Sequence, residues 1–467
     1  MRIVETERKK MNFKKTLLAF VTAVTVMSGL VAEDTRFSYE EIQKTAEEFQ
    51  ADAKKLEETL NAARKGEVDS QLKLAFVYMY DENPEAQIAA YSWFRRAAEK
   101  GNMTGLLWFG HCHAYGIGIG KDMNEAIKWY KKAAEKGSVK APLVLGYIYL
   151  YGKDEIKSSP PEAVKMFRKA AEKGNAEAMA VLGHCYIFGF GVKADKAEGL
   201  KLLQKAAEKD EAGAMLFLAK LSLDAGKEKE SFEWCKKAAD LGNTKAMVEL
   251  ARYYLFGIGV KVDKAEGMKL LHKAAEKDET GAMLLLADVS FKSGKEKESF
   301  EWYKKAADLG DPNAIFGVGR CYIAGSGVKK DEQAGMKLLL KSAELGCAEA
   351  QYFVGIAYLE GVILKENKAA AEKFFKKAAD QGHPDAMVEL GNIYIAQKKV
   401  KEGVALYQKA AELGNAEAMH NLSGHYFIGY GVKRDYDKGM KLLLKSAELG
   451  YEPAVKKVQE MKKLMKE

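Results

Sequence analysis

Residues 175–210 read NAEAMAVLGHCYIFGFGVKADKAEGLKLLQKAAEKD, and this stretch decides the fold. Its first half places Ala178, Leu182 and Tyr186 four residues apart, which puts all three on one stripe of a helix. Its second half contains another apolar stripe with helical spacing, formed by Ala197, Leu200, Leu203 and Ala207. The stretch therefore predicts two consecutive amphipathic helices.

Glycine and capping residues separate these two helices. Gly189 and Gly191 break the first helix, and Asp195 stands where the N-cap of the second helix belongs. Just before the first helix, Gly174 ends the preceding element and Asn175 caps the new one. Residues 175–210 are thus predicted to form one helix–turn–helix unit.

The same unit recurs along most of the chain. A Lys-Ala-Ala-Glu-x-Gly phrase or a close variant ends each unit, and its last position falls at Gly66, Gly101, Gly137, Gly174, Asp210, Gly242, Asp278, Gly310, Gly346, Gly382, Gly414 and Gly450. Successive ends are 32 to 37 residues apart, which gives eleven units across residues 67–450. A period of this length is typical of a solenoid in which each unit packs only on its neighbours.

Two of these units occur twice in succession. Residues 175–242 and 243–310 are a tandem copy, with 48 of 68 positions identical. The 32-residue units lack the Gly-x-Gly-Val loop and are expected to turn more tightly, as at residues 224–227. The array is therefore interpreted as having grown by duplication of a pair of units.

The repeat resembles the Sel-1-like repeat, a relative of the tetratricopeptide repeat. The family motif is A-x-x-x-L-G-x-x-Y-x-x-G-x-G-V-x-x-D-x-x-x-A followed by K-A-A-x-x-G. In the quoted unit it is met by Ala178, Leu182, Gly183, Tyr186, Gly189, Gly191, Val192, Asp195, Ala206 and Ala207. The resemblance implies a right-handed α/α superhelix that serves as an adaptor or scaffold for other proteins, without catalytic residues. Departures from the motif are Asp210 and Asp278 at the terminal glycine position and a missing second glycine in the loop at residues 361–364.

The two ends of the chain are expected to cap the array. Residues 33–66 carry an apolar seam with spacings of four and three from Ile42 to Ala63, which predicts one capping helix or, alternatively, a coiled coil. Residues 451–467 predict a basic amphipathic helix, and its polar outer face is what the end of a solenoid needs. Binding of a membrane surface by the lysines of this helix is the alternative interpretation.

The N-terminus has the pattern of a secretory signal. Residues 1–15 hold six basic side chains, residues 16–32 hold no charge, and Glu33 and Asp34 follow. We therefore expect a signal peptide at residues 1–32 with cleavage after Ala32, translation starting at Met1 or Met11, and a secreted or periplasmic protein. An uncleaved membrane anchor is the alternative, although the apolar stretch is short for a transmembrane span.

Composition excludes several classes of protein. With 48% hydrophobic and 30% charged residues, the 467-residue chain has enough apolar material for a large core and is not a disordered protein. The formal charge is +8, but residues 33–467 hold 68 basic and 64 acidic side chains. This near balance argues against nucleic acid as a partner, since nucleic-acid binding needs a one-sided basic face.

Local matches to catalytic motifs are interpreted as chance. The glycine loop at residues 116–121 follows a predicted helix, whereas a phosphate-binding loop follows a strand. Ser-x-x-Lys occurs at residues 70–73 and 326–329, but the boxes lie on distant units and no Ser-Asp-Asn box accompanies them. No catalytic residue and no cofactor are therefore expected.

The cysteines and histidines also favour packing over chemistry. Five cysteines is an odd number, and Cys112, Cys185 and Cys321 fall at the same position of different units, too far apart for disulfides. His111 and His113 point to different sides of a helix, so they do not form a chelating pair. Free, packed thiols and no metal site are predicted.

The tenth residue after each unit boundary is the best candidate for contacting a partner. It varies in charge and size while the stripe residues around it repeat, and it lies on the first helix, which lines the concave face in tetratricopeptide-like superhelices. A concave surface with aromatic and basic side chains suits a peptide or partner helix. The candidate residues are His111, Tyr147, His184, Lys220, Arg252, Asp288, Arg320 and Asn392, with Tyr352 at the sixth position of the unit whose tenth residue is Ile356. The alternative is a solvated face that tolerates any side chain.

Together these features predict an all-α solenoid of eleven helix pairs with helical caps. The expected function is that of an exported, non-catalytic scaffold that binds a protein or peptide partner on its concave face. The alternatives are a secreted cell-wall or β-lactam-directed hydrolase and a host-directed effector that uses the same face. Stable membrane insertion is not expected once the signal is cleaved.

Overall fold

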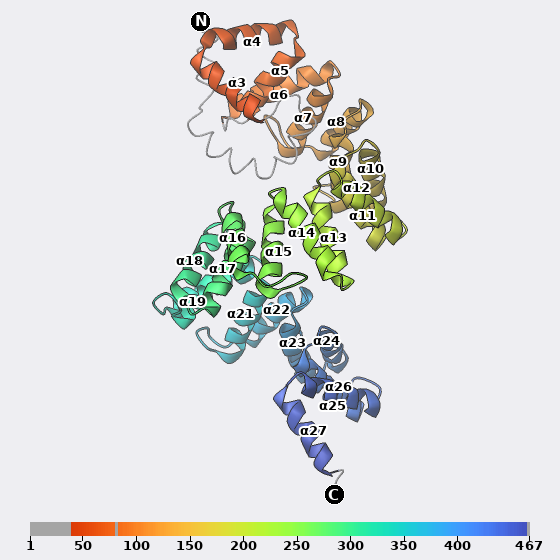
Figure 1. Cartoon of the computed structure of the whole chain (residues 1–467), viewed down its shortest axis with the longest axis vertical. Helices are drawn as coiled ribbons and strands as arrows, with labels where there is room; N and C mark the ends of the chain where they lie inside the picture. The colour runs from red at the N-terminus through yellow and green to blue at the C-terminus, as the bar shows by residue number, and fades with distance from the viewer. Residues whose placement is uncertain (1–38, 80–82, 465–467) are drawn as a thin grey trace. The chain divides into compact units, whose positions relative to one another are not determined.

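The computed structural model describes residues 39–79 and 83–464, so the expected signal peptide lies outside the described residues. Within these ranges the chain forms 25 helices and no strand, and its one β-bridge pairs Lys153 with Ile156. Figure 1 shows the helices following one another as a chain of hairpins. The all-α solenoid expected from the repeat is thereby confirmed.

Each of the eleven repeats is a pair of antiparallel helices. The first helices are α5 (Val68–Met79), α7 (Met103–Tyr115), α9 (Lys140–Tyr151), α11 (Ala176–Phe188), α13 (Ala212–Asp224), α15 (Thr244–Phe256), α17 (Thr280–Lys292), α19 (Pro312–Ala324), α21 (Ala348–Glu360), α23 (Pro384–Ala396) and α25 (Ala416–Ile428). The second helices are α6 (Pro84–Glu99), α8 (Met123–Glu135), α10 (Pro160–Glu172), α12 (Lys196–Ala207), α14 (Glu228–Asp240), α16 (Lys264–Ala275), α18 (Glu296–Asp308), α20 (Glu332–Glu344), α22 (Lys368–Asp380), α24 (Val400–Glu412) and α26 (Tyr436–Glu448). Helices α3 (Tyr39–Ala51) and α4 (Ala53–Lys65) precede the pairs, and α27 (Glu452–Leu464) follows them.

The pairs are gathered into two compact units, Met1–Ala246 and Met247–Glu467. In the first unit, the core begins with the buried rings of Phe76, Phe94 and Trp108, and the centroids of Phe76 and Trp108 lie 5.1 Å apart. In the second unit, Phe375 and Tyr407 are buried within one cluster of apolar side chains. Each pair therefore closes its core against its neighbours rather than around one centre, as a solenoid requires.

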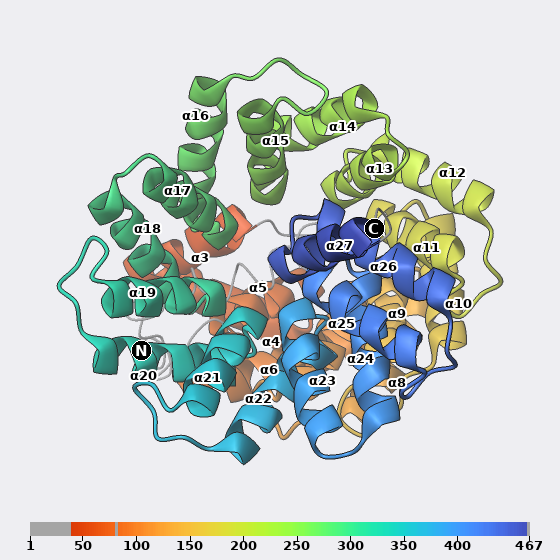
Figure 2. The same ribbon diagram turned by 90° about the horizontal axis from the view of Figure 1, so that it is seen from below.

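The first helices lie on the inner side of the curve within the first unit. Figure 2 shows α9, α11 and α13 inside, with α10, α12 and α14 outside them. Helix α11 also contacts α13 directly, as α17 contacts α19 and α19 contacts α21 in the second unit. Inner helices of a curved array approach one another, so the first helices supply the concave surface.

The predicted capping residues are found where the sequence places them. The side chain of Asn175 accepts a hydrogen bond from the Ala178 N–H (2.7 Å), and that of Asp195 accepts one from the Glu198 N–H (3.0 Å). Gly189 ends α11 with φ of 72°, the left-handed conformation that glycine adopts without strain. These contacts satisfy backbone groups that helix ends otherwise leave unpaired.

The residues that depart from the repeat motif adopt the same left-handed backbone conformation as the glycines that they replace. Asp210 and Asp278 adopt left-handed conformations, with φ of 60° and 59°, at the positions where other units have glycine. Aspartate tolerates this conformation better than most residues, so the helix ends are unchanged. Ile363 is different, because a β-branched side chain at φ of 66° is strained.

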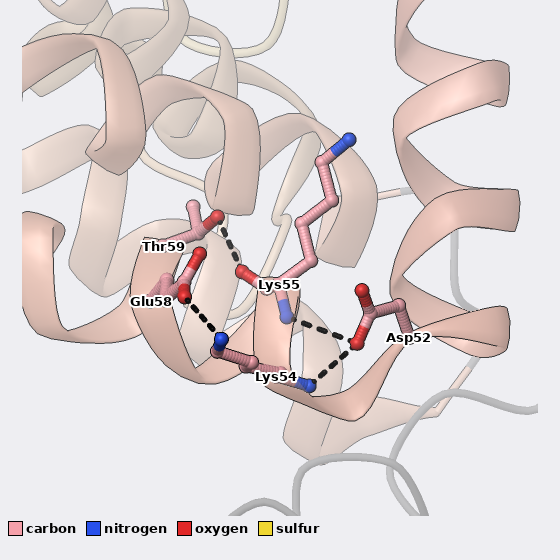
Figure 3. Close-up of polar contacts among 5 residues, drawn as sticks. All are labelled: Asp52, Lys54, Lys55, Glu58 and Thr59. Atoms are coloured by element: carbon pink, nitrogen blue, oxygen red, sulfur yellow. Dashed lines mark hydrogen bonds and ion pairs between the residues drawn. The ribbon is translucent and has the colours of Figure 1, made fainter.

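The N-terminal segment corrects one expectation from the sequence. Residues 33–66 were expected to contain a single capping helix, whereas the described part contains two, α3 and α4, separated at Asp52. Figure 3 shows why the chain restarts here: the Asp52 carboxylate accepts hydrogen bonds from the N–H groups of Lys54 and Lys55. The apolar seam nevertheless continues through Leu56 and Leu60, which are buried. An N-cap therefore interrupts the helix without moving its buried stripe.

None of the described helices combines the length and apolar composition that crossing a bilayer requires.

Candidate partner-binding site

All nine candidate residues lie on first helices, from α7 to α23, but they are not equally accessible. Eight of them reach the surface at least in part: Tyr147 and Tyr352 are half-buried, and the other six are exposed. His111 does not, because its side chain is only 3% exposed. His111 is therefore removed from the set of residues available to a partner.

His111 is instead part of the core of its helix pair. Its Nδ1 lies 2.8 Å from the hydroxyl of Tyr130 on α8, and burial lowers the pKa of the imidazole to about 3. The neighbouring Gly110 allows this arrangement, since a Cβ there would overlap the Tyr130 ring. The tenth position varies between units, and in this unit the variation serves internal packing.

The same internal contact recurs at two exposed candidates. The hydroxyl of Tyr303 on α18 donates a hydrogen bond to Asp288, and that of Tyr407 on α24 donates one to Asn392. Burial, followed by the charges of Glu417 and Glu389, raises the pKa of Tyr407 to about 12, so this phenol remains a donor. A second-helix tyrosine thus fixes the orientation of the tenth residue in these pairs.

Two candidates meet in a groove within the first unit. Tyr147 on α9 and His184 on α11 line an open cavity of about 720 Å³, together with residues of α13. The cavity is also lined by Tyr151, Phe217, Glu177 and Glu211. Its size is within the range of pockets that hold small ligands or a few residues of a peptide.

Aromatic rings and two carboxylates dominate this groove. The rings of Tyr147 and Tyr151 are parallel within 5° with centroids 6.2 Å apart, and those of His184 and Phe217 are 5.0 Å apart. The Tyr147 hydroxyl donates a 2.6 Å hydrogen bond to Glu177, and burial together with this bond raises the pKa of Tyr147.

Lysine side chains do not line the groove, but one influences it. Burial lowers the pKa of His184, and the charge of Lys220 on α13 lowers it further. Among the lining residues, the acidic side chains are Glu177 and Glu211, and there is no lysine or arginine.

The second unit presents a different first-helix surface. The Arg320 guanidinium lies over the rings of Phe316 and Phe353, 5.7 and 5.9 Å from their centroids. Tyr352 stacks on His383 with centroids 4.9 Å apart. The remaining candidate, Arg252, is exposed and lies 3.8 Å from the Glu249 carboxylate. The guanidinium of Arg320 and the ring of Phe353 are thus exposed, whereas the Phe316 ring beneath them belongs to the core.

The side chains that suggested other chemistry are occupied by packing. All five cysteines are free and buried, and burial raises the pKa of Cys112 to about 12, which leaves the thiol protonated and unreactive. The Ser70 hydroxyl donates a 2.9 Å hydrogen bond to the Glu67 carboxylate. Among the described residues, no group of three or more potential ligands is arranged to hold a metal ion.

Reasoning from the sequence missed the other groove residues that carry a ring or a carboxylate, which are Tyr151, Glu177, Phe190, Glu211 and Phe217. They occupy other positions of the repeat than the sixth and the tenth, so a search restricted to those positions passes over them. A comparison of the two tandem copies would have indicated three of these residues, because Glu177, Phe190 and Phe217 are among the positions that differ.

Comparison with known proteins identifies the repeat. The Sel1 repeat family matches eleven times, at residues 68–102, 107–138, 143–175, 176–211, 213–243, 244–279, 282–311, 312–347, 348–383, 384–415 and 416–451. These matches cover well over half of the chain and follow the eleven helix pairs one by one.

Two individual proteins are similar to this chain over about 100 residues each. An ERAD-associated E3 ubiquitin-protein ligase component, HRD3B of Arabidopsis thaliana, is 31% identical over 111 residues, which are 23% of this chain and 17% of that protein. An uncharacterised protein of Neisseria meningitidis is 28% identical over 101 residues, 22% of this chain and 21% of that one. The matches thus span about a fifth of each of these relatives.

Among solved structures, the chain is similar to a protective antigen of uropathogenic Escherichia coli that displays an SLR fold. The identity is 30%, the match covers 88% of this chain and 90% of that one, and the TM-score is 0.47. A Sel1 repeat protein from Oxalobacter formigenes is 26% identical, with 79% and 89% of the two chains covered and a TM-score of 0.31.

Proposed function

This chain belongs to the Sel1 repeat family, and on that premise we propose that it is an exported scaffold that binds a partner protein through its first helices. Sel1-repeat proteins are generally non-catalytic scaffolds for protein–protein interaction. What the proposal adds for this chain is the export and the binding face.

The observation that carries the proposal is the contrast between repeated and exposed positions of the first helices. The side chains facing the core, such as Leu182 and Ala178, are buried and recur from unit to unit. The exposed side chains differ in charge and size between units. They include aromatic rings whose exposure to water is unfavourable, among them Tyr151, which is 75% exposed. Exposed aromatic and arginine side chains on a concave surface are typical of partner recognition.

The experiment is site-specific photo-cross-linking with residues 33–467 as bait. Benzoylphenylalanine placed at Tyr151 or Phe353 probes the first helices, and the same group at Ile88 or Leu444 probes exposed apolar positions of second helices. We expect a discrete partner to cross-link from the first-helix sites. A partner captured only from Ile88 and Leu444 would contradict the proposal.

A surface variant provides the control for this experiment. Arg252→Glu combined with Arg320→Glu reverses two exposed charges on α15 and α19 and leaves the buried side chains unchanged. We expect cross-linking from Phe353 to fall while the helical circular dichroism stays the same. Running envelope and host-cell extracts in parallel distinguishes an envelope adaptor from a host-directed effector.

Export is a separate part of the proposal and has its own test. The basic segment, the uncharged stretch and the polar sequence after Ala32 support a cleaved signal peptide. N-terminal sequencing of the protein recovered after expression of the full chain should begin at Glu33. A mature protein that retains residues 16–32 in the membrane fraction would favour the anchored alternative instead.

A further inference from the structure

We propose that the groove formed by α9, α11 and α13 selects its partner through a lysine or arginine side chain. The inference rests on the proposed function, because it specifies the chemistry of the partner at one part of the first-helix surface. The groove lies entirely within the first compact unit.

The aromatic lining supplies the first part of the argument. Tyr147 and Tyr151 present two parallel rings, while His184 and Phe217 present two more from the next helices. The faces of such rings attract cations, most strongly where water is excluded. A methylene chain that ends in a charged group therefore fits this lining better than a purely apolar side chain of equal length.

The charges of the groove supply the second part. Two carboxylates, Glu177 and Glu211, are among the lining residues, and no lysine or arginine is. Glu177 is held toward the rings by the hydrogen bond from Tyr147, and Glu211 is held at the start of α13 by the N–H of Gly213. An anionic segment entering the groove would meet both carboxylates, whereas a cationic one would be attracted by both.

The tandem copy provides an independent observation. Ten lining residues fall within residues 175–242, and seven of them differ from their counterparts in residues 243–310. Over the other 58 aligned positions, only 13 differ. The duplication has therefore kept the scaffold and changed this surface preferentially, which is the pattern expected of a recognition surface rather than of solvated helix faces.

The nature of these differences points to charge. Glu177 corresponds to Lys245, and the rings of His184, Phe190 and Phe217 correspond to Arg252, Ile258 and Leu285, so the copy replaces one carboxylate and three rings. It carries one new carboxylate and one new ring at other lining positions, Glu249 for Val181 and Tyr253 for Cys185. At the same time Lys220, whose charge reaches His184, corresponds to Asp288. The copy thus contains the substitutions needed to test the groove, each already accommodated at the equivalent position of a helix in the same protein.

The test uses small probes and the folded chain, residues 33–467. The probes are Nα-acetyl-lysine methylamide, Nα-acetyl-arginine methylamide and Nα-acetyl-norleucine methylamide, and the norleucine probe has the same apolar stem without the charge. Saturation-transfer NMR measures binding of each probe. We expect the lysine or the arginine probe to bind about tenfold more tightly than the norleucine probe, and the comparison of the two cations identifies the preferred side chain.

Variants assign this binding to the groove. Glu177→Lys should weaken cation binding about tenfold, and Lys220→Asp should strengthen it severalfold because it removes a nearby positive charge. Glu162→Lys is the matched control: Glu162 also lies in the first turn of its helix, α10, and is exposed, but it does not line the groove. It changes the net charge equally and should leave binding unchanged.

The outcomes separate this inference from the proposed function. Equal binding of the lysine and norleucine probes, no binding of either cation, or an equal loss in Glu177→Lys and Glu162→Lys would overturn the inference. A partner that still cross-links from the first helices in the Glu177→Lys variant would leave the proposed function standing. Cation binding at the groove together with a partner captured only from second helices would overturn the proposed function instead.

Discussion

At the residue scale, single glycines allow the backbones of neighbouring repeats to approach closely. Gly191 in the loop after α11 has φ of 67°, and its Cα lies against the start of α10 in the preceding pair. A methyl group there would overlap the carbonyl of Pro160. Gly226 has a similar φ of 72°, but a methyl group on it would meet nothing within 4 Å. The two glycines therefore separate the effect of backbone conformation from that of close packing.

We predict that Gly191→Ala destabilises the protein more than Gly226→Ala. Both variants force alanine into the left-handed region, at a cost of about 1 kcal/mol each. Gly191→Ala adds the overlap with the preceding pair, which costs a further 1–3 kcal/mol, roughly. Urea unfolding followed by circular dichroism measures the difference, and equal losses in the two variants would show that the close approach has no energetic weight.

His111 gives a second prediction, on the pH dependence of stability. Burial lowers the pKa of His111 to about 3 in the folded protein, from an ordinary value near 6.5. Between these values the unfolded chain binds the proton and the folded chain does not, so the free energy of unfolding falls as the pH falls. The slope contributed by one such group is about 1.4 kcal/mol per pH unit. His111→Asn should remove this contribution.

The repeat itself supplies the reason for choosing asparagine. Asn392 accepts a hydrogen bond from the Tyr407 hydroxyl, and His111 forms the equivalent contact with the Tyr130 hydroxyl. An asparagine at position 111 therefore keeps a hydrogen-bond partner for Tyr130. Urea unfolding between pH 6.5 and pH 4, followed by tryptophan fluorescence, should have a shallower pH dependence in His111→Asn than in the unaltered chain. His272→Asn, at an exposed position of α16, is the control. Identical slopes in all three proteins would refute the role of His111.

The sequence predicts residue roles well where the repeat fixes them and poorly where it varies. Asn175 and Asp195 were identified as N-caps from their spacing alone, because capping depends on neighbours in the chain. The burial of His111 depends on Tyr130, nineteen residues away on another helix, and no local pattern reports it. Variation at a repeat position therefore indicates either recognition or a change in internal packing, and only the structure separates the two.

At the scale of the helix, N-caps determine where the second helices begin. The side chain of Asp331 accepts the N–H of Ala334 at 2.9 Å and starts α20, and Asn367 does the same for α22. We predict that Asp331→Ala destabilises the protein by about 1 kcal/mol, while Asp331→Asn changes stability by less than about 0.5 kcal/mol. Urea unfolding of both variants provides the measurement, and a loss as large in Asp331→Asn would assign the effect to the charge instead of the cap.

Helix existence was predictable from the sequence, and one helix boundary was not. The apolar seam of residues 33–66 continues across Asp52, so its periodicity alone predicted one helix where the structure has α3 and α4. The capping contacts of Asp52 are local and could have been anticipated from its side chain, but an aspartate inside a helical pattern is also common on a solvated face. Periodicity reports which side of the chain is buried, whereas caps decide where each helix begins.

At the scale of the whole molecule, the free energy of unfolding should be a sum of contributions from each repeat and from the contacts between adjacent repeats. Among the described helices, the extensive contacts within each unit join consecutive helices, so damage at one end is expected to remain near that end. The groove on α9, α11 and α13 follows the same logic, since three consecutive pairs are sufficient to build it. It could not be read from one repeat, because its rings and carboxylates come from three first helices.

The C-terminal helix tests this additivity. Ala454 of α27 is fully buried, and α27 packs on α26. Ala454→Arg places a charge in this contact, at a cost of at least about 2 kcal/mol, and should release α27 from the array. Hydrogen exchange followed by mass spectrometry should then quicken in α25 and α26 and remain unchanged in α7 to α12. Gln459→Arg introduces the same side chain at an exposed position of α27 and should change neither region. Faster exchange along the whole chain in Ala454→Arg would mean that the eleven pairs unfold as one cooperative body, and stability could then not be assigned to individual repeats.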